Sequence, residues 1–198
     1  MKKTLTVILC GVLFVGIAFA QNASKKNETA STTSTVSFDG ETYALAYSDG
    51  GENYNPKWLN EYLRKGDTLE RWIKMVAIRD YGVAVSKHAP EQMALVTSQN
   101  LLASNPQAKY KTYLAEDKNE AMIDFFTWTP DGKIAEFNVF KFAIIDGSLI
   151  SYQFAFREYD GKGGIVDVIN NKQSFVDKVS SIKIPKIQKI IKKENGSK

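Results

Sequence analysis

Three apolar runs decide the fold, and they read AMIDFFTW at residues 121–128, IAEFNVFKFAII at 134–145 and LISYQFAFREY at 149–159. Each run is rich in aromatic and β-branched residues, which favour strands with at least one buried face. Turn-forming sequences separate them, because Pro130-Asp131-Gly132 lies before the second run and Asp146-Gly147 before the third. The stretch 121–159 therefore predicts two consecutive hairpins in the middle of an antiparallel sheet.

The third run indicates which of its side chains face the core. Large apolar residues alternate there with polar or small ones, and the large ones are Ile150, Tyr152, Phe154 and Phe156. A period of two places all four on one side of a strand. In the middle run both phases carry apolar residues. Either a strand covered on both faces or a strand with a bulge explains that pattern.

The first twenty residues have the pattern of a secretory signal peptide. Lys2 and Lys3 precede an apolar stretch from Leu5 to Ile17, and Ala18-Phe19-Ala20 has the small-x-small pattern of a cleavage site. The apolar stretch is shorter than the roughly 20 residues that a membrane-spanning helix needs. We therefore expect export, with cleavage after Ala20.

Cys10 is the one cysteine of the chain. The bulky Leu9 before it departs from the lipoprotein motif, which has a small residue at that place. Cleavage after Ala20 removes Cys10, so the mature chain offers no thiol for a disulfide, a nucleophile or a metal site. An exported protein of this kind is typical of the bacterial envelope, either periplasmic or secreted.

Composition divides the chain into four parts. The signal peptide at 1–20 is followed by residues 21–35, which are rich in Ser, Thr and Asn and predict a flexible tether. Residues 36–182 predict a single α+β domain with an antiparallel sheet flanked by helices. Residues 183–198 form a basic tail.

The basic tail makes the charge distribution uneven in a chain with 26 basic and 22 acidic residues. It holds six lysines and one acidic residue, Glu194. Such a tail attracts anionic lipid or an acidic partner, or it simply keeps a terminus soluble. The lysines with a predicted membrane or partner contact are Lys183, Lys186, Lys189, Lys192 and Lys193.

Turn and helix signals place further elements. Asp39-Gly40 predicts a hairpin turn after Val36, and the composition of 48–56 predicts a loop. Pro90 at a first helical position predicts a helix over 89–103, followed by a strand at 108–114. Apolar residues at near-helical spacing from 165 to 179 predict a last helix that covers the sheet.

The segment 57–81 supports two interpretations. One has a strand near Asn60 to Arg64, a turn at Lys65-Gly66-Asp67 and a strand over Trp72 to Arg79. The other has a helix with Thr68 as its N-cap and an apolar stripe that includes Trp72.

Most catalytic and cofactor motifs are absent from the sequence. His88 is the only histidine, and it lies just before a predicted helix, where a capping or exposed histidine is common. One histidine without a mature cysteine is too few ligands for zinc. The glycines near Gly161 lack the spacing of a phosphate-binding loop. We expect no metal and no cofactor, and four arginines in an exported chain argue against nucleic-acid binding.

Polar residues within the predicted strands form the candidate site. They lie on adjacent strands and line one face of the sheet if the strand registers agree, where they can bind a polar ligand or perform acid–base chemistry. A solvated sheet face with cross-strand charge pairs is the simpler explanation, and the pattern favours it. The candidate residues are Asp124, Glu136, Asn138, Gln153 and Arg157.

Several short strings resemble a group of small exported bacterial proteins of unknown function. These are NEYL at 60–63, GDT at 66–68, WIKMV at 72–76, IDF at 123–125, EFNVF at 136–140 and YQFAFR at 152–157. The order of elements is similar to that of the PsbP-like fold, which includes extrinsic proteins that bind and help assemble membrane complexes. The resemblance implies a non-catalytic role and transfers no functional residue.

The sequence thus predicts an exported, non-catalytic binding or assembly protein of the bacterial envelope, whose partner is another envelope protein or a small ligand. A small-ligand carrier or a hydrolytic enzyme that uses the polar sheet face is an alternative. Weak attachment to anionic membranes through the basic tail is another.

Overall fold

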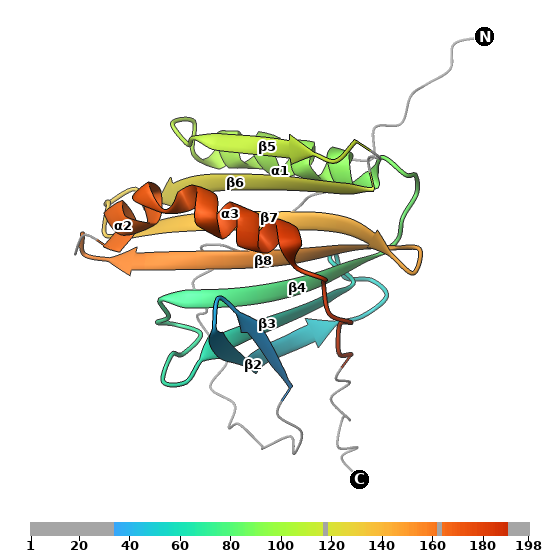
Figure 1. The fold of residues 1–198 in the computed structure, drawn as a ribbon, viewed down its shortest axis with the longest axis horizontal. Helices are drawn as coiled ribbons and strands as arrows, with labels where there is room; N and C mark the ends of the chain where they lie inside the picture. The colour runs from blue at the N-terminus through green and yellow to red at the C-terminus, as the bar shows by residue number, and fades with distance from the viewer. Residues whose placement is uncertain (1–33, 117–118, 162–163, 190–198) are drawn as a thin grey trace.

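The computed structural model describes residues 34–116, 119–161 and 164–189, and eight strands form one antiparallel sheet in this part of the chain (Figure 1). The strands are β1 (Thr35–Phe38), β2 (Glu41–Gly50), β3 (Trp58–Arg64), β4 (Lys74–Val83), β5 (Tyr110–Leu114), β6 (Glu120–Trp128), β7 (Ile134–Ile145) and β8 (Ser148–Tyr159). The helices are α1 (Ala89–Ser104), α2 (Gly164–Asn170) and α3 (Lys172–Ser181). The predicted single α+β domain with an antiparallel sheet is confirmed.

Two four-stranded meanders build the sheet. The strand order is β1-β2-β3-β4-β8-β7-β6-β5, so each meander runs through consecutive strands and the two meet where β4 pairs with β8. Helix α1 carries the chain from β4 in the middle of the sheet to β5 at its edge. The hairpins predicted from 121–159 are β6–β7 and β7–β8.

Two Asp-Gly turns close hairpins as predicted. Asp39 and Gly40 have φ angles of 51° and 74°, and Asp146 and Gly147 have φ angles of 49° and 78°. A two-residue type I′ turn requires positive φ at both of its central residues. Asp and Gly tolerate that conformation better than other residues, which is why the sequence signal is reliable at both places.

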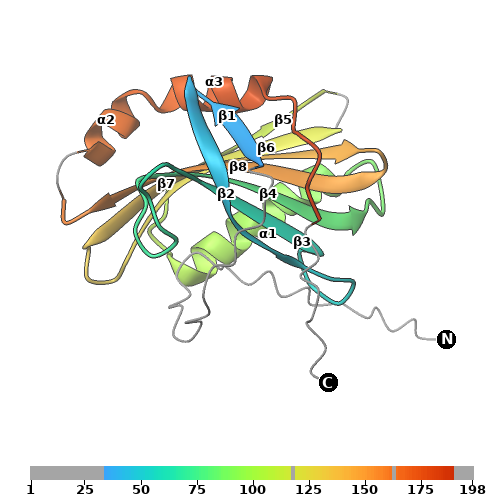
Figure 2. The ribbon, with the colours of Figure 1, turned by 90° about the horizontal axis from the view of Figure 1, so that it is seen from below.

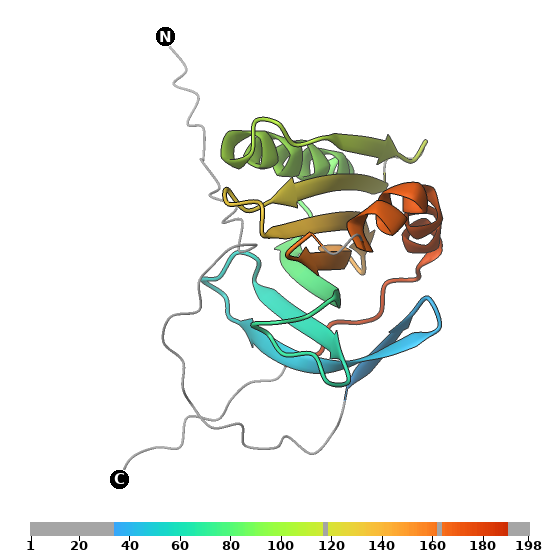
Figure 3. The same cartoon turned by 90° about the vertical axis from the view of Figure 1, so that its left-hand side faces the viewer.

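The helices lie on opposite faces of the sheet (Figure 2 and Figure 3). Helix α1 packs on one face against β5, β6 and β7, whereas α2 and α3 pack on the other against β7 and β8. The β1–β2 hairpin curls over the same side as α3. We call the two sides the α1 face and the α3 face.

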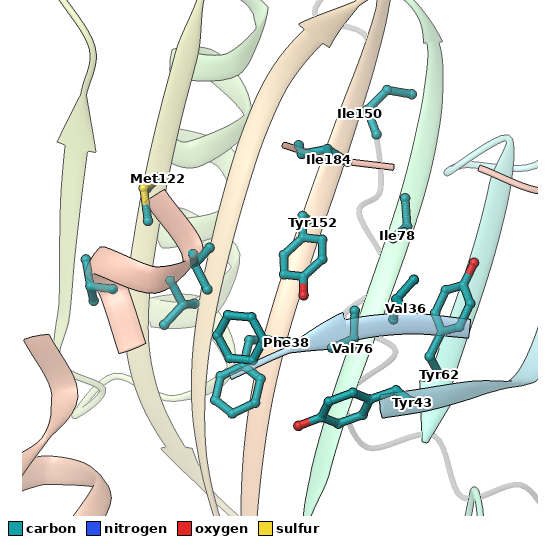
Figure 4. Packing of buried hydrophobic residues seen from close by; sticks show 14 of the residues in the cluster. Val36, Phe38, Tyr43, Tyr62, Val76, Ile78, Met122, Ile150, Tyr152 and Ile184 are labelled. Atoms are coloured by element: carbon teal, nitrogen blue, oxygen red, sulfur yellow. The ribbon is translucent and has the colours of Figure 1, made fainter. Parts of the chain in front are cut away.

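The largest core lies on the α3 face. Tyr152 and Phe154 of β8 point into it, as the alternation of that run predicts, and Val179 of α3 covers them. The ring of Phe38 from β1 lies 4.5 Å from that of Phe154, measured between centroids. Ile184, beyond α3, packs over the same core near Tyr152 (Figure 4).

Strand β7 is covered on both faces. Phe137 and Val139 belong to the α3-face core, whereas Phe142 and the half-buried Phe140 pack with Leu101 of α1. The pairing of β7 with β6 and with β8 shows no shift of register. Double burial, and not a bulge, therefore explains the two apolar phases of this run.

The structure decides between the two interpretations of segment 57–81. Lys74–Val83 is a strand paired with β3 and β8, so the helical alternative is wrong. The pattern was ambiguous because a central strand is apolar on both sides. Composition was also misleading at 48–50, where β2 continues, because these residues pair with the first residues of β3.

Candidate functional site

Six polar side chains from four strands share the α1 face. Residues that pair directly across antiparallel strands point to the same side of the sheet, and Glu136 pairs with Arg157. We call this set the polar strip, and it consists of Glu61 from β3, Arg79 from β4, Glu136 and Asn138 from β7, and Gln153 and Arg157 from β8. The strip runs between the apolar cluster under α1 and a second cluster that contains Trp72 and Met75.

Hydrogen bonds connect three members of the strip in a row. The Nη1 atom of Arg79 donates to Oε1 of Gln153 at 2.7 Å, and Nε2 of Gln153 donates to Oδ1 of Asn138 at 2.7 Å. Gln153 and Asn138 are 6% and 5% exposed. Because the Gln153 amide is bonded on both sides, its orientation is fixed, and so is the position of the oxygen that Arg79 contacts.

Arg157 and Glu136 form an ion pair at one end of the strip. The Nη2 atom of Arg157 donates to both carboxylate oxygens of Glu136, at 3.1 and 3.3 Å. The guanidinium carbon lies 4.0 Å from the centroid of the Trp72 ring. A planar cation between a carboxylate and an aromatic ring loses little by being partly buried, because both neighbours favour its charge.

Two carboxyls of the strip differ in their surroundings. Burial raises the pKa of Glu136 above its ordinary value, and Arg157 opposes part of that rise. Burial also raises the pKa of Glu61, and the charges of Arg79 and Arg157 oppose that rise. Glu61, unlike Glu136, makes no hydrogen bond to another side chain among the described residues.

Buried polar atoms near the strip have unused bonding capacity. Within the described part of the chain, Nε of Arg157 and Oγ of Ser151 are buried without a hydrogen-bond partner. Ser151 lies on the α1 face because it pairs with Arg79. A buried polar atom without a partner costs on the order of 1–3 kcal/mol, so a bound polar group here would gain by satisfying these atoms.

Asp124 is the one candidate residue that the register separates from the others. It pairs with Val139 and therefore points to the α3 face. Its carboxylate is 1% exposed and accepts hydrogen bonds from the Tyr113 hydroxyl at 2.6 Å and from Nζ of Lys172 at 2.7 Å. Asp124 thus anchors the start of α3 to the sheet and is not part of the polar strip.

The first lysines of the predicted tail belong to a segment that packs on the sheet. Among residues 182–189, Ile184 is only 7% exposed and the carbonyl of Gln188 accepts a hydrogen bond from the buried Asn60 side chain at 3.0 Å. Nζ of Lys189 lies 3.3 Å from the buried carboxylate of Asp80. The packed part of the chain therefore continues beyond the boundary predicted after Ile182.

The remaining tail lysines differ in position. Nζ of Lys186 lies 3.5 Å from the exposed carboxylate of Asp146, and Lys183 is exposed. Lys192 and Lys193 lie outside the described residues, as does the predicted signal peptide at 1–20.

Neither His88 nor any group of potential metal ligands forms a second candidate site among the described residues. His88 precedes α1 and its Nδ1 atom lies 3.5 Å from the Glu91 carboxylate, with 40% of its side chain exposed. The described residues contain no cluster of three or more His, Cys, Asp or Glu side chains placed to hold a metal ion. Nor does this part of the chain contain a helix that is long and apolar enough to cross a membrane.

Two surface hollows lie away from the polar strip. One, of about 630 Å³, is bordered by Glu116, Ile145 and Lys183, and the other, of about 250 Å³, by Ser37, Tyr152 and Lys183. Both are formed where the segment 182–189 crosses the sheet. The strip itself lies on the α1 face between two apolar clusters, and its Glu136, Asn138 and Gln153 side chains are buried.

A protein-family model matches residues 14–194 of the chain. The chain belongs to this family of unknown function. A comparison with curated proteins finds none that matches it. The family match covers nearly the whole chain, including all the elements that build the polar strip.

The sequence analysis missed three residues in or beside the polar strip. Glu61 and Arg79 join the strip from β3 and β4, and Trp72 stacks on Arg157. The sequence did contain a signal, because Glu61 and Arg79 are charged residues next to large apolar ones within strands, and a buried charge needs a partner. Arg79 bonds Gln153, which lies 74 residues further along the chain, and Glu61 is acted on by Arg79 and by the distant Arg157, so only the strand register reveals these contacts.

Proposed function

We propose that the protein is an exported, non-catalytic binding or assembly protein of the bacterial envelope, and that it binds its partner through the polar strip. The leader-like sequence from Lys2 to Ala20 supports export. The similarity of its element order to the PsbP-like fold, whose members include proteins that assist membrane complexes, supports an assembly role by analogy.

The observation that carries the proposal is the fixed geometry of the strip. Arg79 is held by Gln153, which Asn138 holds in turn, and Arg157 is held by Glu136 and Trp72. Such preorganised side chains lose little conformational freedom when a partner binds. Arginine and aromatic residues also contribute much of the binding energy in protein interfaces.

Site-specific photo-crosslinking tests this proposal. Tyr47 is half-buried and pairs with Glu61, so p-benzoylphenylalanine at position 47 would contact a protein bound to the strip. The matched control is the same substitution at Tyr110, an exposed tyrosine on the edge strand β5. We expect irradiated cells to give an adduct from position 47 that the control lacks, identified by mass spectrometry.

Substitution of Arg79 supplies an independent measurement. Arg79→Met keeps the length of the side chain and removes its charge, and we expect it to reduce the yield of the adduct from position 47 about tenfold. The same adducts from positions 47 and 110, or an adduct that Arg79→Met leaves unchanged, would exclude the strip as the partner site.

A small-ligand carrier is a second candidate, because the unpaired Nε of Arg157, the unpaired Oγ of Ser151 and the Glu61 carboxyl lie on the same face of the sheet. An acid or amide with both donor and acceptor atoms fits these groups. Native mass spectrometry of protein isolated from the envelope distinguishes the two candidates. A retained mass that Arg157→Met abolishes supports the carrier, whereas the bare polypeptide mass argues against it.

A further inference from the structure

The two edges of the sheet differ in how they are covered. Strand β1 is one edge; it has only four residues, and the segment 182–185 borders the smaller hollow together with it. Strand β5 is the other edge, and among the described residues it pairs with β6 alone (Figure 1). Four of its five residues are exposed, and its pairing with β6 has no bulge. A regular, open edge strand is a template for pairing with another chain.

The hydrogen bonds to β6 show which backbone groups of β5 point away from the sheet. The carbonyl of Lys109 and the N–H of Ala115 both bond to β6, each at 3.2 Å. Backbone groups alternate in direction along a strand, so every second residue between these two also bonds to β6. The residues in between direct their N–H and C=O groups outward, and they are Tyr110, Thr112 and Leu114.

The same three residues also carry exposed side chains. Tyr110 is 42% exposed, Leu114 is 55% exposed and Thr112 is exposed as well. All three lie on the α1 face, because their partners on β6 belong to the apolar cluster under α1; these partners are Phe125, Ile123 and Ala121. The edge therefore offers free backbone groups and apolar side chains at the same positions.

The outward residues are arranged symmetrically about Thr112, so β5 fits a second copy of itself in antiparallel orientation. With a two-fold axis at Thr112, Tyr110 of each copy faces Leu114 of the other, and their outward N–H and C=O groups lie opposite one another. The contact covers both apolar side chains. The two Thr112 side chains face each other, and Thr–Thr pairs across strands are favourable.

The charges around β5 fit the same arrangement. Lys109 precedes the strand and Glu116 follows it, both are exposed, and neither has an ion-pair partner in the part of the chain that the structure describes. Antiparallel pairing brings Lys109 of each copy opposite Ala115 and next to Glu116 of the other. Lys111 comes to lie opposite Tyr113, whose ring already attracts its ammonium at 4.6 Å within one chain.

We propose that β5 pairs with β5 of a second copy of this chain about a two-fold axis at Thr112, which joins the two sheets into one. Strand β6 separates this edge from the polar strip, so dimer formation and partner binding can fail independently. In the dimer, p-benzoylphenylalanine at position 110 crosslinks two copies. That product has twice the mass of the chain and is distinct from the adduct expected at position 47.

Sedimentation velocity of the chain from 21 to 198 tests the proposal. We expect a monomer–dimer equilibrium between about 1 µM and about 1 mM, because a small interface associates weakly. Thr112→Lys places like charges opposite each other and should raise the dissociation constant at least about fivefold. The matched control is Thr42→Lys, at an exposed threonine of β2 that pairs with Ser37, and it should leave the constant unchanged.

Mixing two variants tests the axis itself. Thr112→Lys and Thr112→Glu should each dimerise poorly alone, whereas an equimolar mixture should form heterodimers about as tightly as the unmodified chain, because opposite charges then meet at the axis. A chain that stays monomeric up to about 1 mM would overturn the proposal and leave the edge to a strand from a different protein. Equal effects of Thr112→Lys and Thr42→Lys, or a mixture that forms no heterodimer, would overturn it as well.

Discussion

At the residue scale, the pair of Glu136 and Arg157 shows charge and burial acting against each other. Side-chain exposure is 11% for Glu136 and 15% for Arg157. Removing one partner leaves the other charge buried and unpaired, so Arg157→Met should cost about 3 kcal/mol of the free energy of unfolding. Adding Glu136→Gln to the Arg157→Met variant should recover a large part of that loss. Urea unfolding of the single and double variants measures these free energies.

The double-mutant cycle gives this prediction its control. Glu136→Gln alone, Arg157→Met alone and the double variant separate the coupling energy from the effect of each side chain. If the two single effects sum to that of the double variant within about 0.5 kcal/mol, the pair contributes no coupling and the prediction is wrong.

Glu61 is expected to make stability depend on pH. Burial raises its pKa above the ordinary value of 4.5. A carboxyl whose pKa is raised by folding stabilises the folded state below its unfolded pKa, and this contribution is lost as pH rises through the folded pKa. Glu61→Gln should therefore raise Tm at about pH 7 and leave it unchanged at about pH 4.

The exposed Glu70 provides the comparison, because it lies in the β3–β4 turn away from the strip. Glu70→Gln should leave Tm nearly the same at both pH values, as surface substitutions usually do. A Glu61→Gln variant that is less stable than the unmodified chain at neutral pH would mean that the attraction of Arg79 and Arg157 outweighs burial.

At the element scale, a buried lysine joins α3 to the sheet. Nζ of Lys141 on β7 donates to the carbonyls of Ser180 and Ile182 at 2.9 and 3.1 Å, and lies 3.0 Å from the Glu120 carboxylate. These carbonyls belong to the last turn of α3 and to the residue just after it, where the helix itself supplies no donor. Lys141→Met should cost about 2–3 kcal/mol in urea unfolding, because charged hydrogen bonds are lost.

Lys133 in the β6–β7 turn is the matched lysine, since its side chain is 70% exposed and pairs with Asp131. Lys133→Met should change the free energy of unfolding by no more than about 0.5 kcal/mol. Equal effects of the two substitutions would show that Lys141 is not needed to hold α3.

Short sequence patterns predicted the individual strands, turns and helices well, but they did not predict how distant strands align with one another. The Asp39-Gly40 and Asp146-Gly147 turns and the helix that begins at Ala89 depend on neighbours in the sequence, so they could be predicted. Asp124 was grouped with Glu136 because both lie on adjacent strands. A register differing by one residue changes the face, and no local signal fixes the register of distant strands.

The candidate site shows the same limit. Glu136, Asn138, Gln153 and Arg157 lie on one predicted hairpin, and their shared face follows from alternation once the turn at Asp146-Gly147 fixes the register. The residues that complete the strip come from the first meander. Their approach depends on the pairing of β4 with β8, which closes only after α1 has crossed the sheet.

At the scale of the whole molecule, the segment 182–189 holds together parts that are far apart in sequence. Its Ile184 packs in a core that also contains Val36 of β1 and Ile150 of β8, and Asn60 of β3 donates to its Gln188 carbonyl. Lys189 neutralises Asp80, which is 6% exposed. The segment therefore stabilises the contact between the two meanders.

Ile184 is the residue at which this role can be measured. Because its side chain is 7% exposed, Ile184→Ala leaves a cavity and should cost about 2–4 kcal/mol in the free energy of unfolding. Ile169 of α2 is 52% exposed, so Ile169→Ala should cost less than about 1 kcal/mol. Urea unfolding of both variants measures the two free-energy losses. If Ile184→Ala costs no more than Ile169→Ala, the segment rests on the surface without supporting the core, and removal of residues 183–198 would then leave the sheet intact.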